Sequence, residues 1–307
     1  MVARPSSRPP VPPYRRCELS TPGHDLKMLT RAAGSSADLV LMDLEDGCAP
    51  SRKVAARGIV AEAARTLDWS GKVLAFRSNG LGTPYFLDDL LEVVGEAGEF
   101  LDLLVLPKIT SAEEVRYVDR LLTQLEWRSG LELGRLRLEV LVETARGVLH
   151  AEEIAHASPR MAALLFGIYD YAGEVGTLVG EDTFTDLSYP RQALLAAARS
   201  AGLLALDGIT SRYKDLALTR REAERSRQMG FDGRWAIHPS QIDVIQQAFT
   251  PTKDELEVAA RRLATYREAD RDGKGAIGLG EEMVDEATVR VEQRKVALGR
   301  RLGLLPP

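Results

Sequence analysis

Cysteine is scarce in this sequence, and long apolar runs are missing. Only Cys17 and Cys48 occur among the 307 residues. Two cysteines are too few for a disulfide framework, and their separation matches no metal-binding knuckle. No stretch approaches the roughly 20 apolar residues that a membrane-spanning helix requires. We therefore expect a soluble protein of the reducing cytoplasm, with no membrane partner.

An excess of basic charge is missing as well. The 40 lysines and arginines and the 45 aspartates and glutamates are scattered along the chain and give a formal net charge of -5. No basic stripe is available to contact phosphate backbones, so we expect no nucleic-acid partner. Residues 1–16 contain five prolines and four arginines but no apolar segment. This composition excludes a signal peptide and predicts a flexible arm.

The sequence also lacks several short motifs of known chemistry. It contains neither the H-E-x-x-H pattern of zinc proteases nor the G-x-S-x-G pattern of serine hydrolases. Gly80 and Gly82 form G-x-G without the third glycine of a dinucleotide-binding fingerprint. This partial match favours an ordinary turn.

What the chain does contain is a regular alternation of apolar segments and helical stretches. Its 45% hydrophobic content is enough for one large core. Eight apolar segments have the length of strands, at 17–21, 39–44, 73–76, 101–106, 136–142, 161–168, 203–206 and 235–237. Several are continuously apolar, as expected for parallel strands that are covered on both faces.

The number of strand segments bears on the fold class. An open doubly wound sheet would show the same alternation of strands and helices, but eight segments favour a closed TIM (β/α)8 barrel. Ser111 with Glu114, and Thr252 with Glu255, form capping-box patterns that open helices. Two helices, from 252 to about 269 and from 285 toward 302, follow the eighth segment. We expect a flexible arm at 1–16, a barrel with the active site at 17–250, and a helical arm or lid at 251–307.

Charged and polar side chains gather where the expected strands end. Reactive groups of such barrels lie at the carboxyl ends of strands, whereas charge inside a strand would be buried at a cost of several kcal/mol. The residues at these ends are Asp43, Glu45, Asp46, Arg77, Asn79, Lys108, Glu143, Asp170, Asp207 and His238. The sequence therefore predicts a polar site at this end of the barrel.

Glu143 and Asp170 are the candidate metal ligands. They follow consecutive strand segments, and neighbouring strands lie about 5 Å apart, so the two carboxylates can share one ion. Two protein oxygens, with water and substrate in the other positions, suit Mg2+, with Mn2+ as a substitute. The competing interpretation makes each acid a surface cap. The cations Arg77 and Lys108 favour the metal site.

Other residues near these ends allow two interpretations each. Arg77 can neutralise an enolate or a carboxylate with its planar fork of donors, or pair with Asp43 or Glu45, and both roles are compatible. Asp43, Glu45 and Asp46 can add metal ligands or hold metal-bound water, or can belong to a loop that caps the next helix. His238 is either a structural residue at a strand end or part of a ligand site.

Seven segments, in order along the chain, carry a family resemblance. They are ELSTPG at 18–23, DLEDGCAP at 43–50, FRSNGLGTPY at 76–85, LPK at 106–108, VETARG at 142–147, FGIYD at 166–170 and FDGRWAIHPSQI at 231–242. Together they resemble the citrate lyase beta-subunit-like acyl-CoA lyases of the HpcH/HpaI aldolase superfamily, in particular the malyl-CoA and β-methylmalyl-CoA lyases. The resemblance implies a TIM barrel.

The resemblance also implies a reaction. A carbon–carbon lyase of this kind binds Mg2+, here through Glu143 and Asp170, and needs no organic cofactor. It splits a 3-hydroxyacyl-CoA such as malyl-CoA, β-methylmalyl-CoA or citramalyl-CoA into a 2-oxo acid and acetyl-CoA or propionyl-CoA. Arg77 would lie at the substrate carbonyl and enolate, with Lys108 as a second catalytic cation. A cation that stabilises a thioester enolate is consistent with this chemistry.

The implied acid that protonates the enolate is Asp285, on an arm that closes over the barrel of a neighbouring subunit. The resemblance therefore implies a homotrimer or hexamer, although the residue type alone makes Asp285 a helix N-cap. The implied contacts to substrate and CoA are Ser20, Lys27, Arg31, Arg77, Tyr169, Ile237 and His238.

Two departures from the family pattern concern the substrate. Ser20 and Asp25 stand where many relatives have an aromatic and a basic residue near the CoA entrance, although Lys27 and Arg31 remain to meet phosphates. The segment between Asp170 and residue 196 is shorter than in typical malyl-CoA lyases. We therefore expect an altered acyl pocket, with a different acyl-CoA or a carrier-protein thioester as the alternative substrate.

Three alternative functions stay open at this point. A thioesterase of the same family would use almost the same site. A metal-dependent aldolase for free hydroxy-keto acids is a second, but such enzymes tend to carry a histidine where this chain has Asp46. The third is a non-catalytic barrel subunit, against which the intact Arg77, Glu143, Asp170 and Asp285 argue.

Overall fold

The computed structural model describes residues 14–179, 187–271, 273, 275–279 and 282–306. Residues 1–13, most of the expected flexible arm, lie outside the described residues. The chain divides into two compact units, residues 1–249 and 250–307. Each unit is described by itself below.

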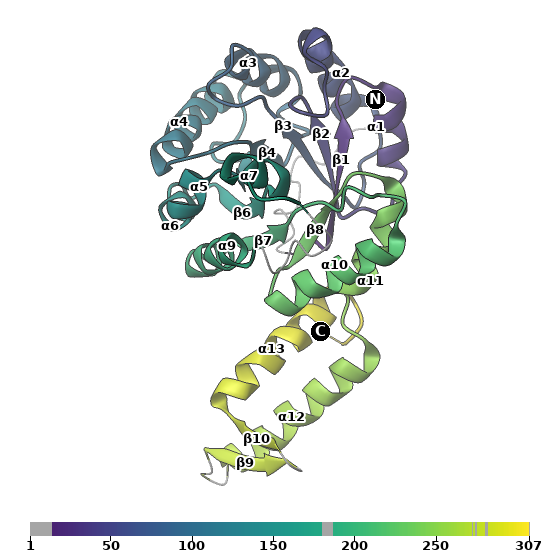
Figure 1. The fold of residues 1–307 in the computed structure, drawn as a ribbon, viewed down its shortest axis with the longest axis vertical. Coiled ribbons are helices and arrows are strands. Elements are labelled where there is room, and N and C mark those ends of the chain that lie inside the picture. Colours follow the sequence, from purple (N-terminus) through teal and green to yellow (C-terminus); the bar gives the residue numbers. More distant parts are fainter. Residues whose placement is uncertain (1–13, 180–186, 272, 274, 280–281, 307) are drawn as a thin grey trace. The chain divides into compact units, whose positions relative to one another are not determined.

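The first unit is a closed barrel of eight parallel strands, which confirms the predicted fold class (Figure 1). Each strand pairs with the next in sequence, and β8 pairs with β1 to close the barrel. The strands are β1 Cys17–Pro22, β2 Leu39–Asp43, β3 Val73–Arg77, β4 Leu103–Leu106, β5 Arg137–Val142, β6 Met161–Phe166, β7 Leu204–Asp207 and β8 Gly233–Ala236.

Helices surround the barrel and cover the outer faces of its strands (Figure 1). They are α1 Leu26–Ala33, η1 Pro50–Arg52, α2 Lys53–Thr66, α3 Phe86–Ala97, α4 Ala112–Arg128, α5 Ala145–Leu149, α6 Ala151–Ala155, α7 Ile168–Val175, α9 Ser188–Ser200, α10 Leu216–Met229, η2 Pro239–Gln241 and α11 Ile242–Phe249. The predicted capping box at α4 is confirmed, because Ser111 and Glu114 each bond the other's backbone.

Alternate residues of each strand build two separate cores. Leu39 and Leu41 of β2 belong to the cluster inside the barrel, whereas Val40 and Met42 pack outward against the helices. Both faces of β2 are fully buried, as its continuous apolar run requires. Because the side-chain direction alternates, residues two apart along a strand point to the same layer.

Asp207 corrects one expectation about the charged strand ends. Its carboxylate is fully buried and pairs with Arg191 Nε at 3.0 Å and Arg234 Nη1 at 3.4 Å. These two arginines hold the pKa of Asp207 below its usual range, against the opposing effect of burial. Asp207 does not line the pocket described below. It links β7, β8 and α9 instead.

The second unit is a helical arm with a two-stranded hairpin. α12 Lys253–Arg271 and α13 Glu286–Arg301 flank the antiparallel strands β9 Ala276–Leu279 and β10 Glu282–Asp285. One cluster of buried hydrophobic residues in this unit consists of Ala259, Leu263, Val284, Val289 and Val296. Asp285 caps α13 by accepting a hydrogen bond from Thr288 N at 2.9 Å, so the N-cap assignment is confirmed. Along the described ranges, no helix is long and apolar enough to cross a membrane.

Gly233 provides a test of barrel closure. A Cβ at this first residue of β8 would overlap the backbone carbonyls of Arg15 and Arg16, which cannot swing aside as a side chain can. We expect Gly233→Ala to lower the free energy of unfolding by about 1–3 kcal/mol, the usual cost of overpacking. Urea denaturation of the purified variant measures this loss.

The matched control is Gly58→Ala, in the middle of α2, where an added Cβ meets no atom within 4 Å. This variant should be stabilised by about 0.5–1 kcal/mol, because alanine favours a helix over glycine. Equal responses of the two variants would contradict the role of Gly233 in closure.

Candidate active site

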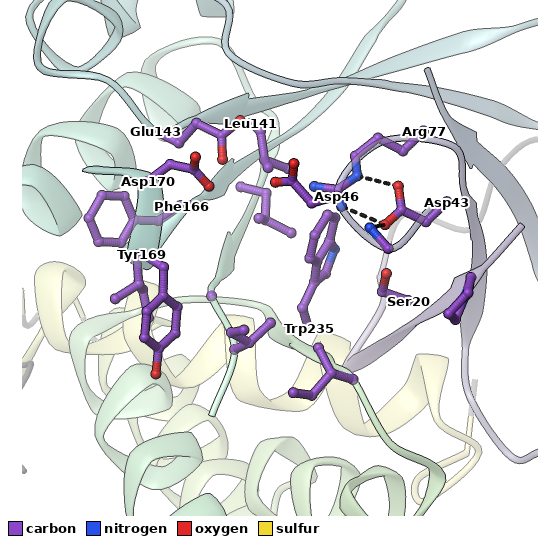
Figure 2. A pocket seen from close by; sticks show the side chains of 18 residues that line it. Ser20, Asp43, Asp46, Arg77, Leu141, Glu143, Phe166, Tyr169, Asp170 and Trp235 are labelled. Carbon is purple, nitrogen blue, oxygen red and sulfur yellow. Dashed lines mark hydrogen bonds and ion pairs between the residues drawn. The ribbon is translucent and has the colours of Figure 1, made fainter. Parts of the chain in front are cut away.

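A pocket of about 380 Å³ opens among the residues that end or follow the barrel strands (Figure 2). Its polar lining comes from five different strands or the loops after them, as is usual at the carboxyl end of such barrels. The polar and aromatic residues that line it are Ser20, Asp43, Asp46, Arg77, Glu143, Phe166, Tyr169, Asp170 and Trp235.

Arg77 is fixed by two carboxylates. Its Nε and Nη2 donate to the two oxygens of Asp43 at 2.8 and 2.6 Å (Figure 2). Its Nη1 lies 3.0 Å from Glu45 Oε2. Among the described residues these contacts use three of the five N–H donors of a guanidinium. Burial alone would lower the pKa of Arg77, but the charges of Asp43 and Glu45 raise it, so Arg77 remains charged.

Asp43 also organises the loop that follows β2. Its Oδ1 and Oδ2 accept hydrogen bonds from Glu45 N and Gly47 N, both at 2.8 Å. A Cβ on Gly47 would approach Asp43 Oδ2 to 2.5 Å, so glycine is required at this close approach. Burial opposes ionisation of Asp43, yet Arg77 and these backbone donors hold its pKa below the ordinary value. Arg77 thus forms the ion pair with Asp43 that the sequence allowed, and both residues also line the pocket.

Lys108 joins the two sides of the pocket. It has a φ of 56°, the left-handed conformation that non-glycine residues rarely adopt. In this conformation its backbone N–H donates to Glu143 Oε1 at 2.8 Å. Its ammonium lies 2.9 Å from Glu45 Oε1, 3.6 Å from Asp170 Oδ1 and 3.7 Å from Asp46 Oδ1. Lys108 thus neutralises part of the negative charge of the site.

Glu143 is buried at the end of β5, with 2% of its surface exposed. Its side chain packs on Gly167, where a Cβ would overlap Glu143 Cβ and Oε2. Burial, followed by the charges of Asp170 and Glu45, raises the pKa of Glu143 to about 8, although Arg77 lowers it. In the absence of a further cation, Glu143 therefore holds a proton at neutral pH.

Asp170 faces Glu143 across one side of the pocket (Figure 2). The strands β5 and β6 are neighbours, as expected from the sequence. However, Asp170 lies in the first turn of α7 rather than at the end of β6. The first turn of this helix places the side chain of Asp170 in the lining of the pocket.

The charge balance of the site favours a bound cation. Five carboxylates stand against the two cations Arg77 and Lys108, which leaves three negative charges if all are ionised. The carboxylates belong to Asp43, Glu45, Asp46, Glu143 and Asp170. Among the described residues, no group of three or more His, Cys, Asp or Glu side chains is arranged to hold a metal ion by itself. The carboxylate oxygens of Glu143 and Asp170 fit a hard cation such as Mg2+, which takes one or two carboxylates and completes its shell with water and substrate.

The remaining predicted contact residues fall into two groups. Ser20, Tyr169 and Ile237 line the pocket, whereas Lys27 and Arg31 are exposed on α1 and His238 lies outside the lining. The structure therefore does not place Lys27, Arg31 or His238 in the pocket with the carboxylates.

Two of the nearby polar residues have structural contacts. Asp25, one of the departures from the family pattern, caps α1 by accepting from Met28 N at 3.0 Å. His238 caps η2 through Ser240 N at 3.2 Å, and its ring stacks on Tyr213 at 4.7 Å.

Sequence reasoning missed the apolar wall of the pocket. Leu141, Leu165 and Trp235 belong to the core inside the barrel and also line the pocket. Trp235 lies 5.4 Å from the guanidinium of Arg77 and donates its indole N–H to Glu18 at 2.8 Å. The signal was available, because a residue two positions before a functional strand end, such as Leu141 before Glu143, points to the same side.

Comparison with known proteins agrees with this geometry. Residues 16–239 match the family described as HpcH/HpaI aldolase/citrate lyase. The chain is 36% identical to an L-malyl-CoA/beta-methylmalyl-CoA lyase of Cereibacter sphaeroides, over 92% of this chain and 94% of that protein. It is 33% identical to a (3S)-malyl-CoA thioesterase of the same species, over 92% and 93%.

Among solved structures, the chain is similar to CitE from Mycobacterium tuberculosis in complex with magnesium, acetoacetate and coenzyme A. The TM-score is 0.77 at 29% identity, and the match covers 94% of this chain and 98% of the other. The chain belongs to the HpcH/HpaI aldolase/citrate lyase family. It is an enzyme of the carbon–carbon lyase class.

The raised pKa of Glu143 gives a test that needs no substrate. An acid whose pKa is higher in the folded protein, about 8 against 4.5, contributes stability below about pH 4.5, and this is lost as the pH rises through 8. Glutamine cannot ionise. Relative to wild type, Glu143→Gln should therefore gain about 1.4 kcal/mol per pH unit across that window in the presence of a chelator.

Urea unfolding between pH 5 and pH 9 measures this difference. Glu113→Gln, which changes an exposed acid on α4, is the control and should show no such trend. A stability difference between Glu143→Gln and wild type that stays constant from pH 5 to pH 9 would contradict the assignment.

Proposed function

We propose that this enzyme is a Mg2+-dependent lyase that cleaves a 3-hydroxyacyl-CoA into a 2-oxo acid and acetyl-CoA or propionyl-CoA. Malyl-CoA, β-methylmalyl-CoA and citramalyl-CoA are the candidate substrates. The observation that carries the proposal is the placement of two carboxylates, Glu143 and Asp170, and the guanidinium of Arg77 on one pocket. Relatives that bind magnesium or act on malyl-CoA support it.

The reaction separates charge in a way that this pocket can accommodate. The 3-hydroxyl group loses its proton, the C2–C3 bond breaks, and the electron pair passes to the thioester as an enolate. Protonation of the enolate at C2 then yields acetyl-CoA or propionyl-CoA, and the former C3 becomes the carbonyl of the oxo acid. When bound by Glu143 and Asp170, Mg2+ would chelate the hydroxy acid and polarise its oxygens.

Arg77 is suited to stabilise the enolate. Its guanidinium is held in place before the reaction, because Asp43 and Glu45 fix three of its N–H groups. Donors that are already oriented cost no reorganisation when negative charge develops, which is the main source of catalysis in such sites. Lys108 would add a second positive charge beside Asp170, at the carboxylate end of the substrate.

The proton donor is proposed to be Asp285, supplied by the arm of a neighbouring copy in a homotrimer or hexamer. In the isolated arm the hydrogen bonds from Thr288 lower the pKa of Asp285, so the carboxyl group is ionised at neutral pH. Burial over a substrate would raise that pKa, since desolvation disfavours the charged form. Closure of the arm would therefore bring Asp285 to the substrate and favour its protonated form.

The CoA moiety is proposed to approach from the side of Ser20. Lys27 and Arg31 lie exposed on α1, the helix that follows β1, where they can meet phosphates. Tyr169 and Ile237 line the pocket, with His238 directly after Ile237. These positions would contact the pantetheine or acyl portion.

A thioesterase is the second candidate, supported by the similarity to a (3S)-malyl-CoA thioesterase. In that reaction water attacks the thioester carbonyl, the C–S bond breaks, and free CoA leaves. The same cation at Arg77 would stabilise the oxyanion. Products therefore separate the two candidates.

A substrate panel tests the proposal directly. With Mg2+, the wild type should release acetyl-CoA or propionyl-CoA and a 2-oxo acid from at least one of malyl-, β-methylmalyl- and citramalyl-CoA, and chelator should abolish this release. Asp285→Asn should lower kcat by about 10²–10⁴-fold, the range for loss of a general acid. Arg77→Met should lower kcat by about 10²–10³-fold. Coupled assays of both products give these rates.

The control for the arm is Glu286→Gln, which removes the next carboxylate on α13 and should leave kcat unchanged. Free CoA without acetyl-CoA would identify a thioesterase. Full activity in the presence of chelator would rule out the metal-dependent mechanism. Mn2+ should substitute for Mg2+, because it prefers the same oxygen ligands.

Metal affinity should depend on pH through Glu143. Since its pKa is about 8 in the protein without metal, a cation must displace a proton below that pH. We expect the affinity for Mg2+ to rise about tenfold per pH unit up to about 8 and then level off. Calorimetric titration at pH 6–9 measures this slope.

Two variants locate the origin of that slope. Asp170→Asn should weaken Mg2+ binding and move the levelling-off to a lower pH, because the charge of Asp170 helps to raise the pKa of Glu143. Glu143→Gln should remove the pH dependence. An affinity that is flat between pH 6 and 8 in the wild type would count against Glu143 as a ligand.

A further inference from the structure

Lys53, the first residue of α2, is a buried cation outside the pocket. Its ammonium donates to Leu44 O at 2.9 Å, Glu45 O at 2.6 Å and Asn79 Oδ1 at 2.5 Å. An ammonium has three N–H donors, so these contacts use all of them. Two of the acceptors are backbone carbonyls. Lys53 therefore fixes the backbone of the loop after β2 and does not depend on the side chains of that loop.

The surroundings of Lys53 make this contact costly to lose. Only 9% of its surface is exposed, and among the described residues its three hydrogen bonds go to uncharged oxygens. A buried charge without a counter-ion is tolerated only when its hydrogen bonds are satisfied. The ring of Tyr85, 5.9 Å from the ammonium, adds a favourable cation–π contact.

The third acceptor, Asn79, is itself fixed. Its backbone N–H and its side-chain Nδ2 donate to Asp89 Oδ2 at 2.8 and 2.7 Å. Asp89 Oδ1 accepts from Arg57 Nε at 2.8 Å. Arg57 follows Lys53 by four positions, so both project from one face of α2. This face anchors the loop after β2 and the segment after β3 to the same helix.

The anchored loop carries the carboxylate that contacts both cations of the site. Glu45 Oε2 lies 3.0 Å from Arg77 Nη1, and Glu45 Oε1 lies 2.9 Å from Lys108 Nζ. The carbonyl held by Lys53 belongs to this same glutamate. A shift of the loop would therefore move Glu45 and change the orientation of Arg77 and Lys108.

We propose that Lys53 is a positioning residue for catalysis, which fixes the backbone of Leu44 and Glu45 so that Glu45 holds Arg77 and Lys108 in their reactive orientation. The inference rests on the proposed lyase function, because Arg77 and Lys108 are the cations of that reaction. Lys53 does not touch the substrate. It acts through Glu45.

The test compares Lys53→Met, which removes the ammonium but keeps the length of the side chain, with Lys53→Arg, which keeps a cationic donor. With a thioester that the wild type cleaves, Lys53→Met should lower kcat per folded protein by about 10- to 100-fold, the cost of small misplacements of catalytic groups. KM should change less than threefold, and Lys53→Arg should retain more of kcat than Lys53→Met. A merely structural role would lower the folded fraction and leave kcat per folded protein unchanged.

The matched control is Arg160→Lys, which loosens a buried cation at the opposite end of the barrel. Arg160 directly precedes β6 and pairs with Asp119 and Glu126 at 2.5 and 2.7 Å. This variant should lower Tm and leave kcat unchanged. A loss of kcat in Arg160→Lys as large as in Lys53→Met would overturn the positioning role.

Amide hydrogen exchange measures the stability of the loop after β2 and requires no enzymatic activity. The N–H groups of Glu45 and Gly47, bonded to Asp43 in the wild type, should exchange faster in Lys53→Met and not in Arg160→Lys. Unchanged exchange, or unchanged kcat, in Lys53→Met would overturn the inference. If the wild type cleaves no thioester, the proposed function fails, and the exchange result alone decides whether Lys53 holds the loop.

Discussion

The ion pair between Arg77 and Asp43 is the contact on which the rest of the site depends. These residues end neighbouring strands and are partners in the register of β2 and β3. The closed barrel therefore brings them together before any side-chain interaction forms. Asp43 also accepts hydrogen bonds from two backbone N–H groups of the loop after β2. Glu45 of that loop contacts Nη1 of the same guanidinium. A buried pair of this kind is costly to break from one side, because the remaining charge has no solvent.

On the opposite side of the pocket, the negative charges of the carboxylates outnumber the positive charges. Glu143 and Asp170 face each other, and among the described residues Lys108 and Arg77 offset their charge. The excess appears as a raised pKa at Glu143 in the protein without metal. Either a proton on Glu143 or a bound divalent cation would reduce the repulsion between these carboxylates. The two halves of the pocket thus differ in charge, with Arg77 held between carboxylates on one side and an excess of carboxylates on the other.

Much of the fold and part of the site could be predicted from the sequence. Continuous apolar segments with charged ends predict a barrel with a polar rim, because apolar side chains are buried within the strands and charged ones are excluded to the strand ends. Asp207 and Asp170 show the limits. A charge at a strand end can face the helices, as Asp207 does with Arg191 of α9. The prediction did not take into account that successive side chains of a strand point to opposite faces. Asp170 reaches the pocket from a helix turn, which a strand-based expectation cannot locate. Lys53 escaped notice because its acceptors are backbone carbonyls, which leave no trace in residue types.

The left-handed backbone of Lys108 has a consequence for laboratory evolution. A non-glycine residue in that conformation stores about 1–2 kcal/mol of strain, and glycine or asparagine at this position would relieve it. A selection for heat resistance alone would therefore favour replacement of Lys108. The same replacement would discard the ammonium that lies between Glu45 and Asp170. If Lys108 has the role proposed above, selection for heat resistance and selection for activity oppose each other at this one position, and libraries that vary it need a selection for both.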